Sequence, residues 1–165
     1  MKRLVDQFKV RLATIDEAFI VSLVLREAFA EYKHLYTVEA FTATTPTPEQ
    51  IKKRWDEGPV WIVQYDGQVV GTVAAVPKEQ SLYIRSMAIR TEARGLGLGK
   101  LLLEQVENFA SQQGFRRLFL NTTPFLDSAI RLYEQFGFIR VDEGPHELHG
   151  TPLFTMEKPV RLDLE

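Results

Sequence analysis

The chain has 165 residues, a formal net charge of −2 and no cysteine. This length suits one domain with its own hydrophobic core, and we expect a single domain over residues 1–165 whose core lies at about 8–158, between loose ends. The near-neutral charge gives no reason to expect nucleic acid or anionic membrane as a partner. Without cysteine the chain cannot form disulfides, a thiolate metal site or a cysteine nucleophile.

The sequence carries no sign of export or membrane insertion. Residues 1–6 are partly charged and no apolar run follows them, so we expect no signal peptide. The most apolar stretch, residues 19–25, is too short to cross a bilayer. We therefore expect a cytoplasmic protein, and the absence of cysteine suits that compartment.

Short predicted strands alternate with predicted helices, which is typical of an α/β sheet protein. Two helix starts carry capping signals, Thr14 with Glu17 and the segment 47–50, and Asp66-Gly67 is a hairpin signal. Residues 35–46 show no clear period, and no helix or strand is predicted there. In chain order we predict strands at 8–12, 60–65, 68–76, 81–89, 117–121, 138–141 and 153–156, and helices from 15 to about 31 or 34, from 48 to 58, from about 98 to 113 and from about 129 to 136.

A glycine-rich segment, residues 94–100, lies between the strand at 81–89 and the helix that begins near residue 98. Its glycines, Gly95, Gly97 and Gly99, let backbone approach a ligand without a Cβ in the way. A helix start adds N–H groups without an internal acceptor and a dipole that attracts negative charge. Arg94 and Lys100 add positive charge at the two ends. The segment therefore predicts a site for an anion such as a diphosphate, with a plain tight turn as the alternative.

Two common phosphate-binding loops do not fit this segment. A P-loop requires Gly, four residues and then Gly-Lys-Ser/Thr. Here Arg94 occupies the first glycine position and Leu101 the Ser/Thr position. A dinucleotide loop requires Gly-x-Gly-x-x-Gly, and its third glycine would fall on Lys100 or Leu102. A nucleotide-dependent enzyme is therefore disfavoured.

A third pattern, Gln/Arg-x-x-Gly-x-Gly/Ala, is matched by Arg94, Gly97 and Gly99. It resembles the acetyl-CoA loop of the GNAT superfamily of N-acetyltransferases. Two neighbouring motifs strengthen the resemblance. One is the strand Met87-Ala88-Ile89 before the loop, and the other is the segment 129–138, which is similar to the family signature A-x-x-L-Y-E-x-x-G-F. The resemblance extends over the element order from about residue 8 to 158.

The resemblance implies a GNAT-like fold: a mixed, mostly antiparallel central sheet of six to seven strands with about four helices, splayed in mid-sheet to hold acetyl-CoA. The strands at 81–89 and 117–121 are those expected to separate. The resemblance further implies acetyl-CoA as acetyl donor and no metal. Asn121 is expected near the pantetheine arm, although a turn-initiating role is the alternative. The expected cofactor-binding residues are Met87, Ala88, Ile89, Arg94, Gly95, Leu96, Gly97, Leu98, Gly99, Lys100, Asn121, Ser128 and Tyr133.

Tyr133 is predicted to be the general acid that protonates the departing CoA thiolate. The alternative is a core aromatic, because Tyr133 also belongs to an apolar stripe of the helix at 129–136. The general base is not identified: an ordered water, an amine that arrives neutral, or one of five side chains could serve, namely Glu31, His34, Glu79, His146 and His149. Arg85, in mid-strand, needs a charged partner, which could be a structural carboxylate or, as the alternative, a carboxylate of the acceptor.

The resemblance implies that a primary amine attacks the thioester directly, without a covalent enzyme intermediate. Acceptor specificity is expected from residues 25–58 and 142–152. The first of these regions is aromatic, which suits a small or amphipathic amine, although lid packing or a homodimer contact fits the same residues: Tyr32, His34, Tyr36, Phe41 and Trp55. Two alternatives stay open: a protein or peptide amine as acceptor, and a non-catalytic acyl-CoA-binding sensor.

Overall fold

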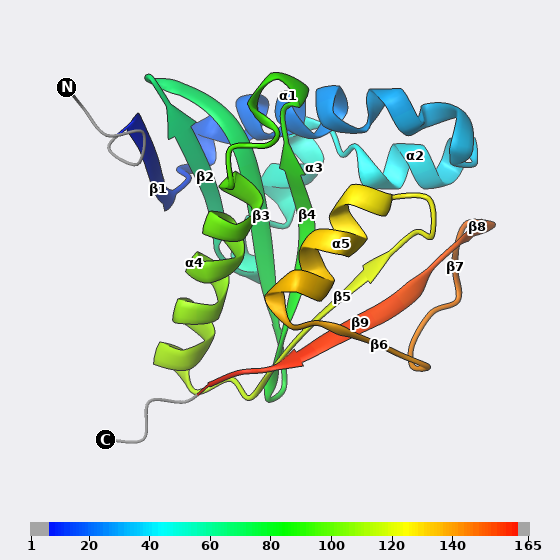
Figure 1. The fold of residues 1–165 in the computed structure, drawn as a ribbon. Helices are drawn as coiled ribbons and strands as arrows, with labels where there is room; N and C mark the ends of the chain where they lie inside the picture. The colour runs from blue at the N-terminus through cyan, green and yellow to red at the C-terminus, as the bar shows by residue number, and fades with distance from the viewer. Residues whose placement is uncertain (1–6, 162–165) are drawn as a thin grey trace.

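The computed structural model describes residues 7–161, so the expectations for residues 1–6 and for the last four residues lie outside it. Figure 1 shows a twisted central sheet between two layers of helices. Its seven strands lie in the order β1-β2-β3-β4-β5-β9-β6, while β7 and β8 form a separate hairpin. Only β4 and β5 among the described strands pair in parallel. The predicted mixed, mostly antiparallel sheet is confirmed.

The first four strands of the sheet form an antiparallel series in which each strand pairs with its predecessor. The hairpin between the second and third strands turns at Asp66 and Gly67, with φ angles of 51° and 80°. This left-handed pair is what a tight two-residue hairpin requires. Every strand predicted in this region is confirmed, and the third runs two residues further than predicted. The four are β1 (Phe8–Leu12), β2 (Val60–Tyr65), β3 (Gln68–Lys78) and β4 (Ser81–Ile89).

The two predicted capping boxes begin the helices of the N-terminal half. The Thr14 N–H donates to Glu17 Oε1 at 2.9 Å, in a 3₁₀ turn that leads into α1 (Ala18–Phe29). A further 3₁₀ segment, Ala30–Leu35, follows α1, so helical backbone extends to about the predicted end. α3 (Pro48–Lys53) begins where the Thr47 N–H donates to Gln50 Oε1 at 2.9 Å and the Gln50 N–H returns a bond to Thr47 Oγ1 at 3.2 Å. A 3₁₀ turn at Trp55–Glu57 follows it.

The prediction of no helix at residues 35–46 is wrong, because α2 occupies Val38–Thr44. Thr37 caps this helix, since its Oγ1 accepts a bond from the Ala40 N–H at 3.1 Å. Thr37 also forms hydrogen bonds to two residues more than a hundred positions later. Its N–H donates to Thr151 Oγ1 at 2.9 Å, and its Oγ1 donates to the His149 carbonyl at 2.8 Å. Those partners belong to a hairpin of β7 (Glu147–Leu148) and β8 (Thr151–Pro152) that the sequence did not predict. Residues 7–161 therefore hold five α-helices rather than about four.

The C-terminal half confirms the remaining predicted elements. Its two helices end at the predicted glycines, Gly114 and Gly137, which both take positive φ. The last strand begins one residue later and ends three residues later than predicted. The elements are α4 (Leu98–Gln113), β5 (Arg117–Thr122), α5 (Asp127–Phe136), β6 (Ile139–Val141) and β9 (Phe154–Pro159).

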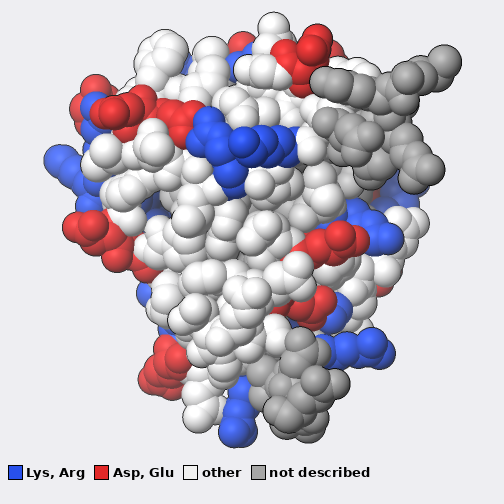
Figure 2. All heavy atoms as spheres, turned by 90° about the vertical axis from the view of Figure 1, so that its left-hand side faces the viewer, with Lys and Arg blue, Asp and Glu red and all other residues white. Residues whose placement is uncertain are grey.

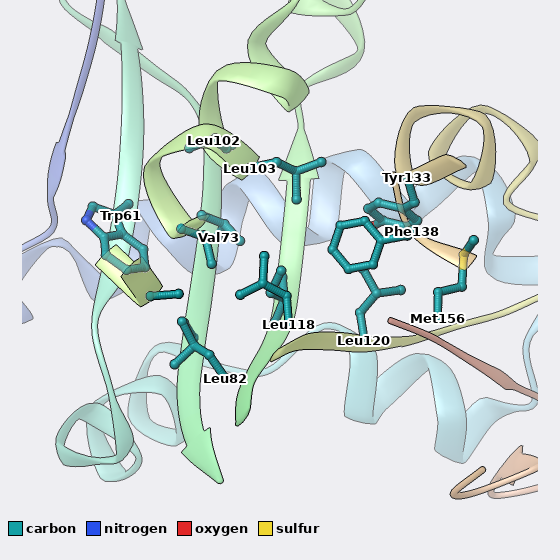
Figure 3. Packing of buried hydrophobic residues seen from close by; sticks show 14 of the residues in the cluster. Trp61, Val73, Leu82, Leu102, Leu103, Leu118, Leu120, Tyr133, Phe138 and Met156 are labelled. Carbon is teal, nitrogen blue, oxygen red and sulfur yellow. The ribbon is translucent and has the colours of Figure 1, made fainter. Parts of the chain in front are cut away.

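Two hydrophobic cores lie on opposite faces of the sheet. The main core packs the sheet against α4 and α5, and a smaller core lies against α1 and α3. Strand alternation decides which residues join which core: Trp61 and Val63 belong to the main core, and Ile62 to the smaller one. Figure 3 shows Tyr133 beside Phe138 at one end of the main core, where the two ring centroids lie 5.9 Å apart.

β4 leaves its neighbour β5 about a third of the way along its length. The two strands pair only where Ser81–Tyr83 lie beside Arg117–Phe119, so the predicted separation is confirmed. On its other side β4 carries a bulge against β3, at which Ser86 takes a φ of 54°. The bulge reverses the alternation: Ile84 belongs to the main core, whereas Ala88, four residues later, belongs to the smaller one. Met87 and Ile89 consequently face the main core.

Surface charge, helix length and the grouping of metal-binding side chains indicate which partners the described residues could take. On the face shown in Figure 2, acidic and basic side chains are interspersed and neither sign dominates. Among residues 7–161, none of the helices combines the length and apolar character needed to cross a membrane. The same residues bring no three His, Asp or Glu side chains together in a way that could hold a metal ion.

Candidate active site

The glycine-rich segment forms the turn that joins β4 to α4. Gly95 and Gly97 have φ angles of 80° and 79°, and a Cβ at either position would meet nothing within 4 Å. The left-handed backbone, not a lack of room, is therefore what requires glycine here. Gly97 is also the N-cap of α4, so the amides of the following turn have no helical acceptor. These amides and the open space beside the glycines can accommodate an anion.

A cavity of about 690 Å³ lies along this turn, and we call it the donor cavity. The turn, the end of β4, α5 and the end of α1 surround it. Its lining includes every predicted cofactor-binding residue except Leu96, which is exposed, and Asn121. The sequence did not predict the remaining lining residues, which come from the end of α1 and the 3₁₀ segment after it, from the turn before residue 94, and from α5 with its N-cap: Ala28, Phe29, Tyr32, Ala93, Leu126, Ala129, Leu132, Gln135 and Phe136.

Asn121 lies on the other side of the sheet. Leu118 and Leu120 point into the main core, so alternation along β5 places Phe119 and Asn121 on the opposite face. There the Asn121 Oδ1 accepts a hydrogen bond from Thr155 Oγ1 at 2.7 Å. Asn121 lines a second cavity of about 360 Å³, which we call the acceptor cavity.

The two cavities meet where β4 and β5 separate. They share four lining residues: Phe29, Met87, Leu126 and Tyr133. The acceptor cavity is otherwise lined from α2, the end of α3, β4, β5 and the hairpin β7–β8. A reacting group held at this junction would therefore be accessible from both cavities.

Tyr133 is buried at this junction, with 8% of its surface exposed. Burial, and to a smaller extent the nearby Tyr36, raises the pKa of Tyr133 to about 12. The phenol is consequently protonated throughout the neutral range. Among residues 7–161 its hydroxyl has no hydrogen-bond partner, and its ring packs against Phe138. The ring thus belongs to the core, and the residue also lines both cavities, while the role of general acid stays a prediction.

The two basic residues at the ends of the glycine-rich turn differ in their surroundings. Arg94 forms an ion pair with Glu31 and its Nη2 donates to the Ala28 carbonyl at 3.0 Å, which ties the turn to the end of α1. Lys100 is 69% exposed and its Nζ lies 3.9 Å from Glu104 Oε1. Part of the predicted positive charge is therefore already paired with a carboxylate.

The side chains considered as general base lie outside both cavities. Glu31 is engaged with Arg94, and the other four are exposed: His34, Glu79, His146 and His149. The acceptor cavity does contain an acidic residue, Glu147, which is exposed on β7 and which carries no motif that would have selected it. No general base is assigned: Glu147 or water could take the proton, or the amine could arrive neutral.

Residues 25–58 were expected to help select the acceptor, and their aromatic side chains either pack in the protein interior or line one of the cavities. Tyr36 is buried and lines the acceptor cavity, where its ring packs against Phe29, Phe41 and Phe125. Tyr32 lines the donor cavity. Trp55 packs against the smaller core under α1. These aromatics are placed by their contacts inside the chain, in keeping with lid packing.

Arg85 has the structural partner expected of it. Its Nη2 lies 3.2 Å from Glu57 Oε1 and its Nη1 lies 3.4 Å from Glu57 Oε2. Glu57 comes from the 3₁₀ turn after α3, on the face of the sheet that α1 and α3 cover. Arg85 also lines the acceptor cavity, so the second expectation for it, contact with an acceptor carboxylate, is compatible with its position.

Comparison with known proteins identifies the class of this fold and site. Residues 23–138 match the model of the acetyltransferase (GNAT) family. An uncharacterized N-acetyltransferase of Escherichia coli (strain K12), YjgM, is 31% identical over 138 residues, which cover 80% of this chain and 82% of that protein. The chain belongs to the GNAT family and is an acyltransferase of the N-acetyltransferase type.

More distant similarities agree with this assignment. A probable N-acetyltransferase of Xenopus tropicalis, camello, is 35% identical over 101 residues, covering 58% of this chain but only 46% of that longer protein. The crystal structure of the PaiA N-acetyltransferase from Thermoplasma acidophilum, in complex with coenzyme A, superposes with a TM-score of 0.78. The superposed residues cover 92% of this chain and 98% of that one. Because the sequences are only 18% identical, this similarity concerns the fold alone.

Proposed function

We propose that this chain transfers an acetyl group from acetyl-CoA to a primary amine of a small molecule. The observation that carries the proposal is the donor cavity, whose lining from one turn, one strand end and one helix includes the expected donor-binding residues other than Leu96 and Asn121. Its volume lies within the ordinary range for small-molecule and cofactor sites. The relatives' names and the coenzyme A bound to a protein of the same fold support the choice of donor.

Three parts of the chain would hold the donor. The free amides at the start of α4 and the left-handed turn at Gly95 and Gly97 suit its diphosphate. The β4 edge beyond Tyr83, which β5 no longer pairs, suits the amides of the pantetheine arm. A backbone N–H at Met87 or Ile89 would polarise the thioester carbonyl.

When bound, acetyl-CoA would supply the acetyl group as a thioester at the junction of the cavities. The amine nitrogen forms the new bond to the acetyl carbon while the carbon–sulfur bond breaks, and both substrates are present together. The amine gives up one proton, to water or to another base, and the leaving sulfur gains one. Tyr133 lies at the junction and carries a proton, so we assign it to the sulfur.

The binding half of the proposal can be tested with a matched pair of glycines on α4. Gly97 and Gly114 cap the two ends of the helix, have φ angles of 79° and 82°, and face open space. Replacing either with alanine should therefore cost a similar amount of stability, about 1 kcal/mol. Only Gly97→Ala should weaken acetyl-CoA binding, by about tenfold or more, because only that turn faces the donor cavity.

Thermal shift and calorimetric titration with acetyl-CoA would measure both effects. Wild-type protein at a ligand concentration of about a hundred times the dissociation constant should gain about 2.7 kcal/mol of stability. Equal affinities in the two variants would show that the turn does not bind the donor. Binding without release of free CoA in the presence of any amine would favour the non-catalytic sensor instead.

A further inference from the structure

Two arginines from different elements line the acceptor cavity. Arg54 is the C-cap of α3, and Arg85 lies in mid-β4 on the face of the sheet that α1 and α3 cover. Glu57 pairs with Arg85 at 3.2 Å, while within residues 7–161 Arg54 forms no ion pair. Glu57 is itself 44% exposed, so water weakens its attraction. The cluster therefore carries an excess of one positive charge.

The hydrogen-bonding capacity of this cluster is also incomplete. The Arg85 Nε is buried and has no partner among the described residues. The two bonds that Arg85 Nη1 and Nη2 donate to Glu57 are longer than the usual 2.7–2.9 Å of charge-assisted bonds. Burial, followed by repulsion from Arg85, lowers the pKa of Arg54. A buried donor without an acceptor and two neighbouring guanidinium groups are both unfavourable. An anion placed between the two guanidinium groups would accept a hydrogen bond from the unpartnered donor and would offset the repulsion between the two charges.

The position of the cluster relates it to the reaction. Arg85 precedes Met87 by two residues, across the bulge at Ser86, and both residues line the acceptor cavity. Met87 and Tyr133 line the junction where the amine would meet the thioester. A molecule the size of an amino acid can therefore reach from the guanidinium groups to the junction. The acidic residue among the cavity's lining, Glu147, is exposed on β7, so solvent screens its repulsion of an anion.

We propose that the acceptor amine carries a carboxylate, which the guanidinium groups of Arg85 and Arg54 bind in the acceptor cavity. This inference rests on the proposed acetyltransferase function and narrows its substrate class to amino acids and related amino carboxylates. A planar carboxylate matches the fork of a guanidinium group and offsets its charge, whereas an amide offers one uncharged acceptor oxygen and a plain amine offers none. The chemistry of transfer is unchanged: the amine gains the acetyl group and CoA leaves as the thiol.

The test uses sets of three acceptors that differ only at the carboxyl group. Each L-amino acid is compared with its amide and with the amine that lacks the carboxyl group, and release of free CoA is followed with acetyl-CoA at saturation. The acid of at least one set should exceed its amide in kcat/KM by about 30-fold, the value of one charge-assisted interaction. This comparison uses wild-type protein and depends on no variant.

Variants then assign the preference to the two arginines. Arg85→Gln and Arg54→Gln should each lower kcat/KM for the acid by about tenfold or more while leaving the amide unchanged, and Arg85→Lys should restore part of the loss. Arg117→Gln is the matched control, because Arg117 also pairs with a carboxylate from a strand but lines neither cavity. Thermal unfolding of each variant checks that it is folded.

The outcomes separate this inference from the function on which it rests. Amines or amides that serve as well as the acids would overturn the inference while acetyl transfer stands. Acetylation of peptide N-termini without acetylation of free amino acids would also overturn it. If acetyl-CoA neither stabilises the wild-type protein nor releases CoA with any amine, the proposed function itself is wrong.

Discussion

Replacing Tyr133 with phenylalanine removes one hydroxyl from the junction of the two cavities. The aromatic ring and its contact with Phe138, at a centroid distance of 5.9 Å, would be retained. No hydrogen bond to another residue in 7–161 is lost, so the free energy of unfolding at neutral pH should change by less than about 1 kcal/mol. Turnover should fall, because the leaving sulfur loses its donor.

The size of this loss follows from the pKa. A phenol with a pKa of about 12 is a poor acid towards a thiolate, whose ordinary pKa is about 8.5, but it remains a good hydrogen-bond donor. A hydrogen bond to a charged group contributes about 1.5–3 kcal/mol, which corresponds to roughly a 10- to 150-fold lower kcat. Acetyl-CoA affinity should change far less.

Steady-state kinetics at saturating acetyl-CoA and amine, together with calorimetric binding, would measure these quantities. Tyr65→Phe is the control, since Tyr65 is half-buried on β2 and lines neither cavity. An unchanged kcat in Tyr133→Phe would return Tyr133 to a purely structural role.

The same variant has an expected effect on the pH dependence of stability. Because the pKa of Tyr133 is raised from 10.0 to about 12 in the folded protein, the wild-type protein should lose stability as pH rises between these values. Tyr133→Phe should remove that part of the loss.

Two surface ion pairs give further predictions. Arg11 lowers the pKa of Glu17 from 4.5 to about 2, so its stabilisation is present above pH 4.5 and lost as pH falls towards 2. Glu17→Gln should therefore lower the free energy of urea unfolding by about 1 kcal/mol at pH 7 and by almost nothing at pH 2. Glu31→Gln should release Arg94 and tighten acetyl-CoA binding about two- to fivefold in calorimetry at low salt. Weaker binding would mean that Glu31 holds Arg94 in its binding position.

Much of the fold was predictable because its signals are local. The capping box of α3 and the left-handed turn at Asp66 and Gly67 are decided by residues one to three positions apart. α2 was missed for the opposite reason. It is short, its threonines favour helix weakly, and its cap at Thr37 is bound by Thr151 and by His149. A window of sequence around α2 contains neither partner.

The residues of the candidate site also differ in whether local sequence or distant contacts determine their positions. The glycine-rich turn and Tyr133 were predicted from continuous motifs, and they line one cavity. Asn121 was expected in that cavity, but alternation along β5 places it on the opposite face. Arg54 was not considered, because only the packing of α3 against the sheet brings it near Arg85. Residues that act together across elements are the ones that sequence motifs leave out.

The early separation of β4 from β5 divides the sheet into two parts. Three residues of each strand, Ser81–Tyr83 and Arg117–Phe119, are the whole backbone pairing between the four-stranded part and the three-stranded part. Few backbone hydrogen bonds therefore join the two parts, and side-chain packing in the main core supplies the rest of their contact. A donor that fills the gap with its own amides would add hydrogen bonds at the unpaired strand edge. Binding of the first substrate would then help to shape the cavity that receives the second.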